Sequence, residues 1–207
     1  AVGGGLRKIQ DVDALLRIGV DKVYVNSEAI RNKNFLKELV QKYGSSTIGV
    51  NIDTIYNGNF YEVLIETGRE KTGIELFKWI DKVQEMNVGE ITVTDIMYEG
   101  RKKGFNTELY KDLRKRVSTQ LVAHGGAGSF EDIKKLFMET DVDAVSISSL
   151  LHYNYLERIE DKELQGSTVF INTIDNLSRN ENLINDLKLY LSKNGILVRI
   201  WKKKLDW

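Results

Sequence analysis

Short apolar runs alternate with amphipathic stretches along the chain. The runs are rich in Val, Ile and Thr and are bounded by Gly, Asn, Asp or Ser, which is typical of β-strands. We predict six strands, which end near Val2 and cover Lys22–Asn26, Thr47–Asp53, Glu90–Asp95, Gln120–His124 and Ala144–Ser148. Between them, apolar residues recur at spacings of three and four, which predicts helices over residues 9–19, 35–44, 74–86, 109–117 and 130–139. This alternation favours an α/β fold around a parallel sheet.

One segment departs from this alternation. Apolar and polar side chains alternate over residues 54–68, and the dipeptide Asn57-Gly58 lies within that segment. Asn-Gly is favoured in tight hairpin turns because both residues tolerate positive φ angles. We therefore expect a β-hairpin that projects from the end of the third strand.

Two distant stretches of the chain repeat the same pattern of strand, glycine cluster, helix and strand. At an offset of 122 residues, Gly3-Gly4-Gly5 aligns with Gly125-Gly126-Ala127, and Asp21–Ser27 aligns with Asp143–Ser149. The helix between them aligns at an offset of 121, with Asp11 matching Asp132. Such self-similarity indicates a duplicated half, and a parallel sheet made of two like halves can close into a barrel.

Each repeat predicts a phosphate site. A glycine cluster between a strand and a helix lets backbone N–H groups approach an anion, and the helix dipole adds partial positive charge. In each repeat the second strand leads into small polar residues, Asn26 and Ser27 or Ser148 and Ser149. Two such sites would suit a ligand with a phosphate at each end. The alternative is that the glycines only make tight turns.

Composition limits the classes of partner and cofactor that are expected for this chain. Lys+Arg and Asp+Glu both number 30, so the formal net charge is zero and neither nucleic acid nor an anionic membrane is expected as a partner. The chain has no cysteine and two histidines, which excludes disulfides and thiolate metal sites, so we expect no metal or cofactor and a reduced, cytoplasmic setting. No apolar run reaches the roughly 18 residues that span a bilayer.

Asp53 is the most prominent single carboxylate. It ends the apolar strand "IGVNID", at the edge where barrel enzymes carry their catalytic groups. An aspartate at a strand end can instead cap the following turn, and the pattern alone leaves both interpretations open.

The segments "VGGGLRKIQDVDALLRIGVDKVYVNSEA", "GVNIDT", "KTGIELFKWIDKVQEMNVGEITVTDI", "GGAGSFEDIKKLF" and "SKNGILVR" together resemble the cyclase subunit of imidazole glycerol phosphate synthase. The resemblance covers residues 2–152 and returns over 187–199. It implies a TIM barrel, here one partial domain over residues 1–207 that lacks the first two strand-helix units. A sugar-phosphate isomerase of the same pathway shares the twin phosphate sites, but "VDKVYVNS" and "NGILVR" favour the cyclase.

The resemblance also implies a function. The family is a lyase of histidine biosynthesis that pairs with a glutaminase as a heterodimer and uses its ammonia on a diphosphorylated substrate, forming imidazole glycerol phosphate and an aminoimidazole ribonucleotide. Asp53 matches a catalytic aspartate, and Thr72 matches a position near the substrate glycol. Phosphate ligands are implied at Gly4, Asn26 and Ser27 for one end, and at Gly100, Gly126, Ser148 and Ser149 for the other.

Several residues depart from the family pattern. Met97 and Glu99 replace aspartates, Arg101 replaces a threonine, and His124 replaces a serine beside the second glycine cluster, while His152 matches a family histidine. The connection over residues 154–182 is longer than in the family. These departures resemble a divergent branch from surface-polysaccharide gene clusters, in which the barrel delivers ammonia for sugar amidation. A phosphate-binding scaffold without catalytic activity is the third alternative.

Overall fold

A single curved sheet organises the molecule. The computed structural model describes residues 1–32, 34–156 and 182–200. Parallel strands follow one another in the order β1-β2-β3-β6-β7-β8. Their bounds are β1 Val2–Gly3, β2 Val23–Val25, β3 Ile48–Tyr56, β6 Glu90–Asp95, β7 Gln120–His124 and β8 Ala144–Ser146. All six predicted strands are confirmed, although β2 and β8 end before the last small polar residues that the sequence had included. Asp53 was expected to end the third strand, but β3 continues to Tyr56 because residues 53–56 pair with β4.

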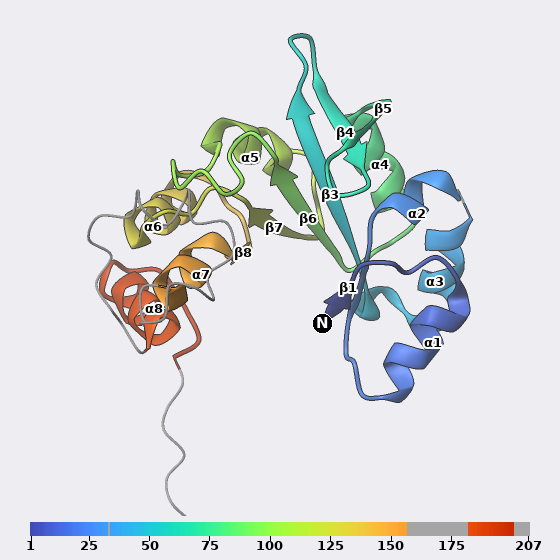
Figure 1. Cartoon of the computed structure of the whole chain (residues 1–207), viewed down its shortest axis with the longest axis horizontal. Coiled ribbons are helices and arrows are strands. Elements are labelled where there is room, and N and C mark those ends of the chain that lie inside the picture. The colour runs from blue at the N-terminus through green and yellow to red at the C-terminus, as the bar shows by residue number, and fades with distance from the viewer. Residues whose placement is uncertain (33, 157–181, 201–207) are drawn as a thin grey trace, which may run out of the picture.

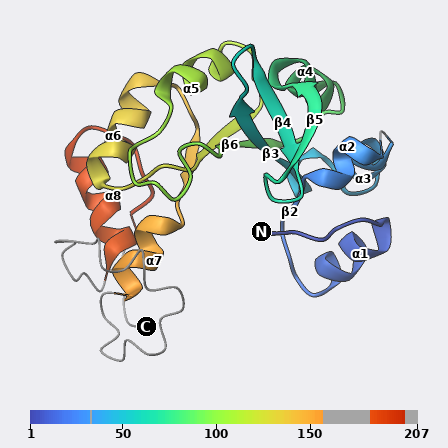
Figure 2. The ribbon, with the colours of Figure 1, turned by 45° about the horizontal axis from the view of Figure 1, so that its top comes forward.

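Helices follow the parallel strands and pack on the outer side of the sheet, as Figures 1 and 2 show. They are α1 Ile9–Arg17, α2 Ser27–Arg31, α3 Phe35–Tyr43, α4 Leu76–Glu85, α5 Thr107–Arg114, α6 Phe130–Glu139, α7 Ser149–Leu156 and α8 Leu183–Lys193, with a short 3-10 turn over Ser45–Thr47. The core lies between these helices and the outer face of the sheet. The strands contribute Val50, Ile52, Ile91, Val93 and Leu121, and the helices contribute Leu39, Ile80 and Leu113. Burying this apolar layer is the main stabilising term of the fold.

The expected hairpin is present at the end of β3. Strand β4 (Tyr61–Ile65) pairs antiparallel with β3, and β5 (Glu70–Glu75) pairs antiparallel with β4. The turn is held by Asn57, whose Oδ1 accepts hydrogen bonds from the backbone N–H groups of Asn59 and Phe60, both at 3.1 Å. Figure 1 shows this hairpin projecting beyond the rest of the sheet.

Several elements differ from the sequence prediction, which did not include β5, α2, α7 or α8. Residues 74–86 were expected to be helical, but Ile74 and Glu75 belong to β5 and α4 begins at Leu76. The Glu75 side chain caps α4 by accepting hydrogen bonds from the N–H groups of Phe77 and Lys78, which explains the later start. Helix α2 was not expected, since five residues are too short to show a helical period.

The sheet forms a partial TIM barrel. Its parallel strands alternate with helices and curl into an open half-barrel, in which β1 and β8 are the end strands. Within the described ranges no helix is long and apolar enough to cross a membrane. Most of the connection predicted to be long, residues 157–181 of 154–182, lies outside the described residues.

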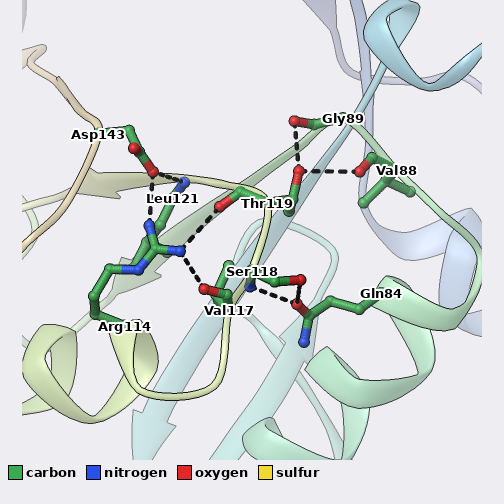
Figure 3. A network of polar contacts seen from close by, with 9 residues as sticks. All are labelled: Gln84, Val88, Gly89, Arg114, Val117, Ser118, Thr119, Leu121 and Asp143. Carbon is green, nitrogen blue, oxygen red and sulfur yellow. Dashed lines mark hydrogen bonds and ion pairs between the residues drawn. The ribbon is translucent and has the colours of Figure 1, made fainter.

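A polar network fixes the amino ends of β6, β7 and β8 (Figure 3). Arg114 lies 2.8 Å from Asp143 Oδ2, and the same oxygen accepts a hydrogen bond of 2.7 Å from the N–H of Leu121. Thr119 Oγ1 donates to the carbonyl oxygen of Gly89 at 2.8 Å. Because these contacts tie neighbouring strands together at one end, the side chains at their carboxyl ends keep a fixed relative position.

Candidate functional site

A cleft of about 800 Å³ opens on the inner face of the half-barrel, toward the carboxyl ends of the strands. Its walls come from six parallel strands, the loops that follow them and the β4–β5 turn. The lining includes Gly4, Gly5, Arg7, Asn26, Ser27, Arg31, Asn51, Asp53, Glu66, Thr92, Thr94, Glu99, His124 and Ser146. In barrel enzymes this end of the strands carries the active site.

Asp53 lies on the inner face of β3. Its Oδ2 accepts a hydrogen bond of 3.0 Å from Nδ2 of Asn26, the residue that follows β2. Burial raises the pKa of Asp53 above the ordinary aspartate value, and the negative charge of Glu99 raises it further, while the Asn26 bond and His124 act in the opposite direction. A carboxyl group with a raised pKa at a cleft floor is suited to general acid–base chemistry.

Asn26 has an unused acceptor. In the part of the chain that the structure describes, its Oδ1 is a buried oxygen without a hydrogen-bond partner. A buried acceptor without a partner costs free energy, so a bound ligand with an N–H or O–H group would recover that cost. Asn26 is therefore equipped to contact the ligand and to orient Asp53 at the same time.

The first glycine cluster is open to a ligand. Gly4 and Gly5 have φ angles of +101° and +69°, and a Cβ atom built on either would meet nothing within 4 Å. Packing therefore does not explain these glycines, whereas the left-handed backbone conformation does. Successive N–H groups in such a turn form an anion-binding concavity.

Both repeats cap their helices in the same way. Asp11 Oδ2 accepts hydrogen bonds from the N–H groups of Arg7 and Lys8 at 3.0 and 2.9 Å. Asp132 Oδ2 does the same for Gly128 and Ser129 at 3.0 and 2.8 Å. This match supports the predicted duplication. Since these carboxylates already accept hydrogen bonds from amides before α1 and α6, those amides are not available to a bound anion.

The second glycine cluster is packed against a loop. Gly126 is buried, its carbonyl oxygen accepts a 2.9 Å hydrogen bond from the N–H of Gly104, and a Cβ on Gly126 would lie 2.1 Å from Gly104 O. A Cβ on Gly128 would lie 2.4 Å from the carbonyl oxygen of Lys102. Gly100, Gly126, Ser148 and Ser149 follow β6, β7 and β8, but they do not line the cleft that contains Asp53.

Thr72 lies on β5, away from the cleft lining. Its hydroxyl donates a hydrogen bond of 2.7 Å to the carbonyl oxygen of Val63 and accepts one of 3.1 Å from the N–H of Ile74. These bonds fix the β4–β5 pairing, so the structure does not bring Thr72 together with Asp53.

The β4–β5 turn covers the end of the cleft near Ser27. Ser27 Oγ accepts a 3.0 Å hydrogen bond from the N–H of Glu66, and Arg31 forms ion pairs with Glu66 at 2.6 Å and Glu70 at 3.5 Å. Glu66 and Thr67 both have positive φ angles, 51° and 59°. Sequence reasoning missed Arg31 and Glu66 because β5 was not expected.

A second ionisable cluster faces Asp53 across the cleft. His124 Nδ1 lies 3.1 Å from Ser146 Oγ, and His124 Nε2 lies 3.5 Å from Glu99 Oε1. The histidine lowers the pKa of Glu99 below the ordinary glutamate value. Glu99 and His124 were noted as departures in the sequence, but only the fold shows that they meet. Among the described residues, no group of three or more His, Cys, Asp or Glu could hold a metal ion.

Comparisons with known proteins give a consistent result. A family model described as "Histidine biosynthesis protein" matches residues 1–157. The chain is 36% identical over 154 residues to "Imidazole glycerol phosphate synthase subunit HisF" of Alkaliphilus metalliredigens, covering 74% of this chain and 61% of that protein. It is 32% identical over 199 residues to the protein of that name from Pyrococcus furiosus, and the match covers 96% of this chain and 68% of that protein. The protein of that name from Pyrobaculum aerophilum is 39% identical over 155 residues, and the match covers 75% of this chain and 61% of that protein. The chain thus spans 61% to 68% of these relatives' lengths.

Proposed function

The chain belongs to the histidine biosynthesis protein family, and from that premise we propose that it is the cyclase subunit of an imidazole glycerol phosphate synthase, a lyase. It uses ammonia from a glutaminase partner to convert a diphosphorylated precursor into imidazole glycerol phosphate and an aminoimidazole ribonucleotide. The names of the relatives described above support this activity. The absence of cysteine supports a reduced cytoplasmic setting.

One observation carries the proposal. Asp53, with its raised pKa, lies in the same cleft as the open glycine turn of Gly4, next to Asn26 and Ser27. A phosphate held at this end would position the body of the ligand over Asp53. We assign one phosphate to Gly4, Asn26 and Ser27.

The other phosphate is assigned to Gly100, Gly126, Ser148 and Ser149. These residues belong to the segments that follow β6, β7 and β8, at the same end of the strands as Asp53. Gly126 supports this assignment indirectly, because its close packing against Gly104 fixes the loop that carries Gly100. Holding both ends of the substrate fixes its reacting atoms near Asp53, which lowers the entropic barrier to ring closure.

Asp53 performs the proton transfer in this mechanism. In its protonated form it donates a proton to the substrate when the ring closes. Asn26 holds the carboxyl group in place through the bond to Oδ2, and its Oδ1 accepts a hydrogen bond from the substrate. Thr72 keeps the β4–β5 pairing in register rather than contacting the substrate directly.

The inner face of the sheet supports the passage of ammonia. Asn51, Thr92, Thr94 and Asp53 all line the cleft, whereas the interior of a TIM barrel is usually filled by bulky branched residues. Polar side chains along the strands offer hydrogen bonds to ammonia as it approaches Asp53. This feature fits a heterodimer in which a glutaminase releases ammonia toward the barrel.

Turnover with ammonium salt tests the proposal. The purified full chain is assayed with the diphosphorylated precursor and ammonium chloride, and we expect imidazole glycerol phosphate to form. Asp53→Asn should lower kcat by roughly 10²- to 10⁴-fold, the usual contribution of a general acid–base group. Asp81→Asn is the matched control, because Asp81 lies on α4 in an ion pair with Arg116 outside the cleft.

Two other outcomes would identify the alternatives. A chain that stimulates a glutaminase but forms no imidazole ring would be an ammonia-delivery subunit for another acceptor, such as a sugar. A chain that binds phosphate and does neither would be a scaffold. Either result contradicts the cyclase proposal.

A further inference from the structure

Four residues on neighbouring strands form one polar row across the cleft. The sheet register pairs Asp53 of β3 with Thr94 of β6, Thr94 with His124 of β7, and His124 with Ser146 of β8. Residues in register on adjacent strands point to the same face of a sheet, and all four line the cleft. Strands lie about 4.8 Å apart, so the backbones of Asp53 and His124 are separated by roughly 10 Å, with Thr94 between them.

His124 is fixed by contacts on both sides of its ring. Ser146 lies 3.1 Å from Nδ1, and Glu99 of the β6–α5 loop lies 3.5 Å from Nε2. The backbone of His124 is held by Tyr110 of α5, whose hydroxyl donates to His124 O at 3.0 Å and accepts from His124 N at 3.2 Å. These contacts leave His124 little freedom to turn away from Glu99.

The loop that carries Glu99 is also held in place. The N–H of Glu99 donates a 3.1 Å hydrogen bond to the carbonyl oxygen of Asp95, and Gly125 packs so closely that an added Cβ would lie 3.3 Å from Glu99 Cβ. The Glu99 side chain is 50% exposed, so its carboxylate reaches the open cleft. It therefore lies where it can contact both His124 and a ligand.

The two carboxyl groups of the cleft have opposite environments. Burial raises the pKa of Asp53, while the hydrogen bond and charge of His124 lower the pKa of Glu99. Near neutral pH, Glu99 is ionised and Asp53 is the group that holds a proton more readily. Two carboxyl groups whose pKa values are driven apart are suited to act as base and acid in one reaction.

We propose that Glu99, oriented by His124, is a second acid–base group of the cleft and works opposite Asp53. The inference rests on the proposed cyclase function. When the ring closes, the Glu99 carboxylate accepts one proton from the substrate and the Asp53 carboxyl group donates one to it, so the total charge of the two carboxyls is unchanged. His124 acts through Glu99 and is a positioning residue.

The ionisable groups that face His124 come from three elements. They are Glu99 on the β6–α5 loop, Asp53 on β3 and Tyr110 on α5. Burial raises the pKa of Tyr110, so it stays neutral over the range in which the carboxyl groups titrate. Asp95, at the end of β6, accepts hydrogen bonds from Asn106 and from the N–H of Met97. The pH response of this region is therefore assigned to Glu99 and Asp53.

The pH–rate profile with ammonium salt tests the role of the pair. Glu99→Gln should lower kcat by roughly 10²- to 10⁴-fold, and Glu99→Asp should restore part of the loss. His124→Gln should move the acidic limb of the profile to higher pH, because the pKa of Glu99 rises when the histidine is removed. His152→Gln is the matched control, since His152 is exposed on α7, and its profile should equal that of the unmodified protein.

The results separate this inference from the proposed function. An active protein in which Glu99→Gln keeps full kcat, or His124→Gln keeps the original acidic limb, overturns the inference alone. An inactive unmodified protein overturns the proposed function and the catalytic role with it. Carboxyl ¹³C NMR then decides whether Glu99 and His124 interact. The Glu99 signal is identified by its loss in Glu99→Gln, and His124→Gln should raise the titration midpoint of that signal. An unchanged midpoint refutes the pair.

Discussion

At the scale of single residues, the raised pKa of Asp53 predicts a conflict between function and stability. A carboxyl group whose pKa is higher in the folded than in the unfolded protein stabilises the fold below the unfolded pKa and loses that contribution as pH rises through the folded pKa. Asp53→Asn cannot ionise, so its free energy of unfolding relative to the unmodified protein should increase from pH 4 to pH 7. Urea unfolding at both values measures this, and a difference independent of pH would contradict it.

The two glycine clusters predict different costs for the same substitution. Gly4→Ala should destabilise the folded protein by about 1–2 kcal/mol, which is the cost of a left-handed backbone for a residue with a side chain. No steric cost is added, because the new Cβ would meet nothing within 4 Å. Gly126→Ala should cost roughly 1–3 kcal/mol more, because its Cβ would overlap the carbonyl oxygen of Gly104. Urea unfolding compares the two variants. Equal costs would show that the loop shifts freely to accommodate the methyl group.

Single residues show where sequence reasoning succeeds and where it stops. The strand pattern placed Asp53 at the carboxyl end of the sheet, and the repeat placed Asn26 and Ser27 in the same region, because strand ends in a parallel sheet lie along one edge. The meeting of Glu99 with His124 depends on how one loop folds back over the next strand. Nothing in the spacing of the two residues along the chain encodes that contact.

At the scale of elements, a core-facing stripe that recurs every three to four residues allowed five helices to be predicted, α1, α3, α4, α5 and α6. Strand β5 was missed, since Ile74 near its end lies three residues before Phe77 of α4 and so also fits the period of the helix that follows. The hairpin turn was located from Asn57-Gly58, but the turn has four residues and depends on the side chain of Asn57. Turn length was thus decided by a local hydrogen bond rather than by the dipeptide alone.

The β4–β5 turn predicts competition between Glu66 and phosphate. Glu66 holds the Arg31 guanidinium at 2.6 Å beside Ser27, which we assign to the first phosphate. Glu66→Gln removes the competing negative charge and the shorter of the two ion pairs of Arg31, so the Kd for inorganic phosphate should fall about two- to five-fold, the range expected for an exposed ion pair. Isothermal titration at constant ionic strength measures it.

Glu70→Gln is the control for this prediction. Glu70 pairs with the same arginine at 3.5 Å and is more exposed than Glu66, so its replacement should change the phosphate affinity less. Weaker phosphate binding by Glu66→Gln would show that the turn supports the phosphate site instead of competing for it.

At the scale of the whole molecule, the order of strands could be anticipated because sequential strand-helix units place neighbours side by side. The sequence could not give the inner surface that these strands create, since each strand contributes only every second residue to it. Asp53, Thr94, His124 and Ser146 are far apart in the chain and align only through the sheet register. The sheet register therefore decides which polar side chains meet in the cleft.

The open sheet predicts self-association that depends on pH. Strands β1 and β8 end the sheet within the described residues, and unpaired edges can pair with another chain. With a formal net charge of zero and a pI of about 7.0, no electrostatic repulsion opposes contact at pH 7. Light scattering should therefore show the strongest association near pH 7 and less at pH 9.

Val2→Lys, which puts a charge on β1, should weaken the association at pH 7. Ile18→Lys adds the same charge at an exposed apolar residue after α1, away from the edge. Equal effects of both variants would mean that net charge alone controls association and that the sheet edge takes no part.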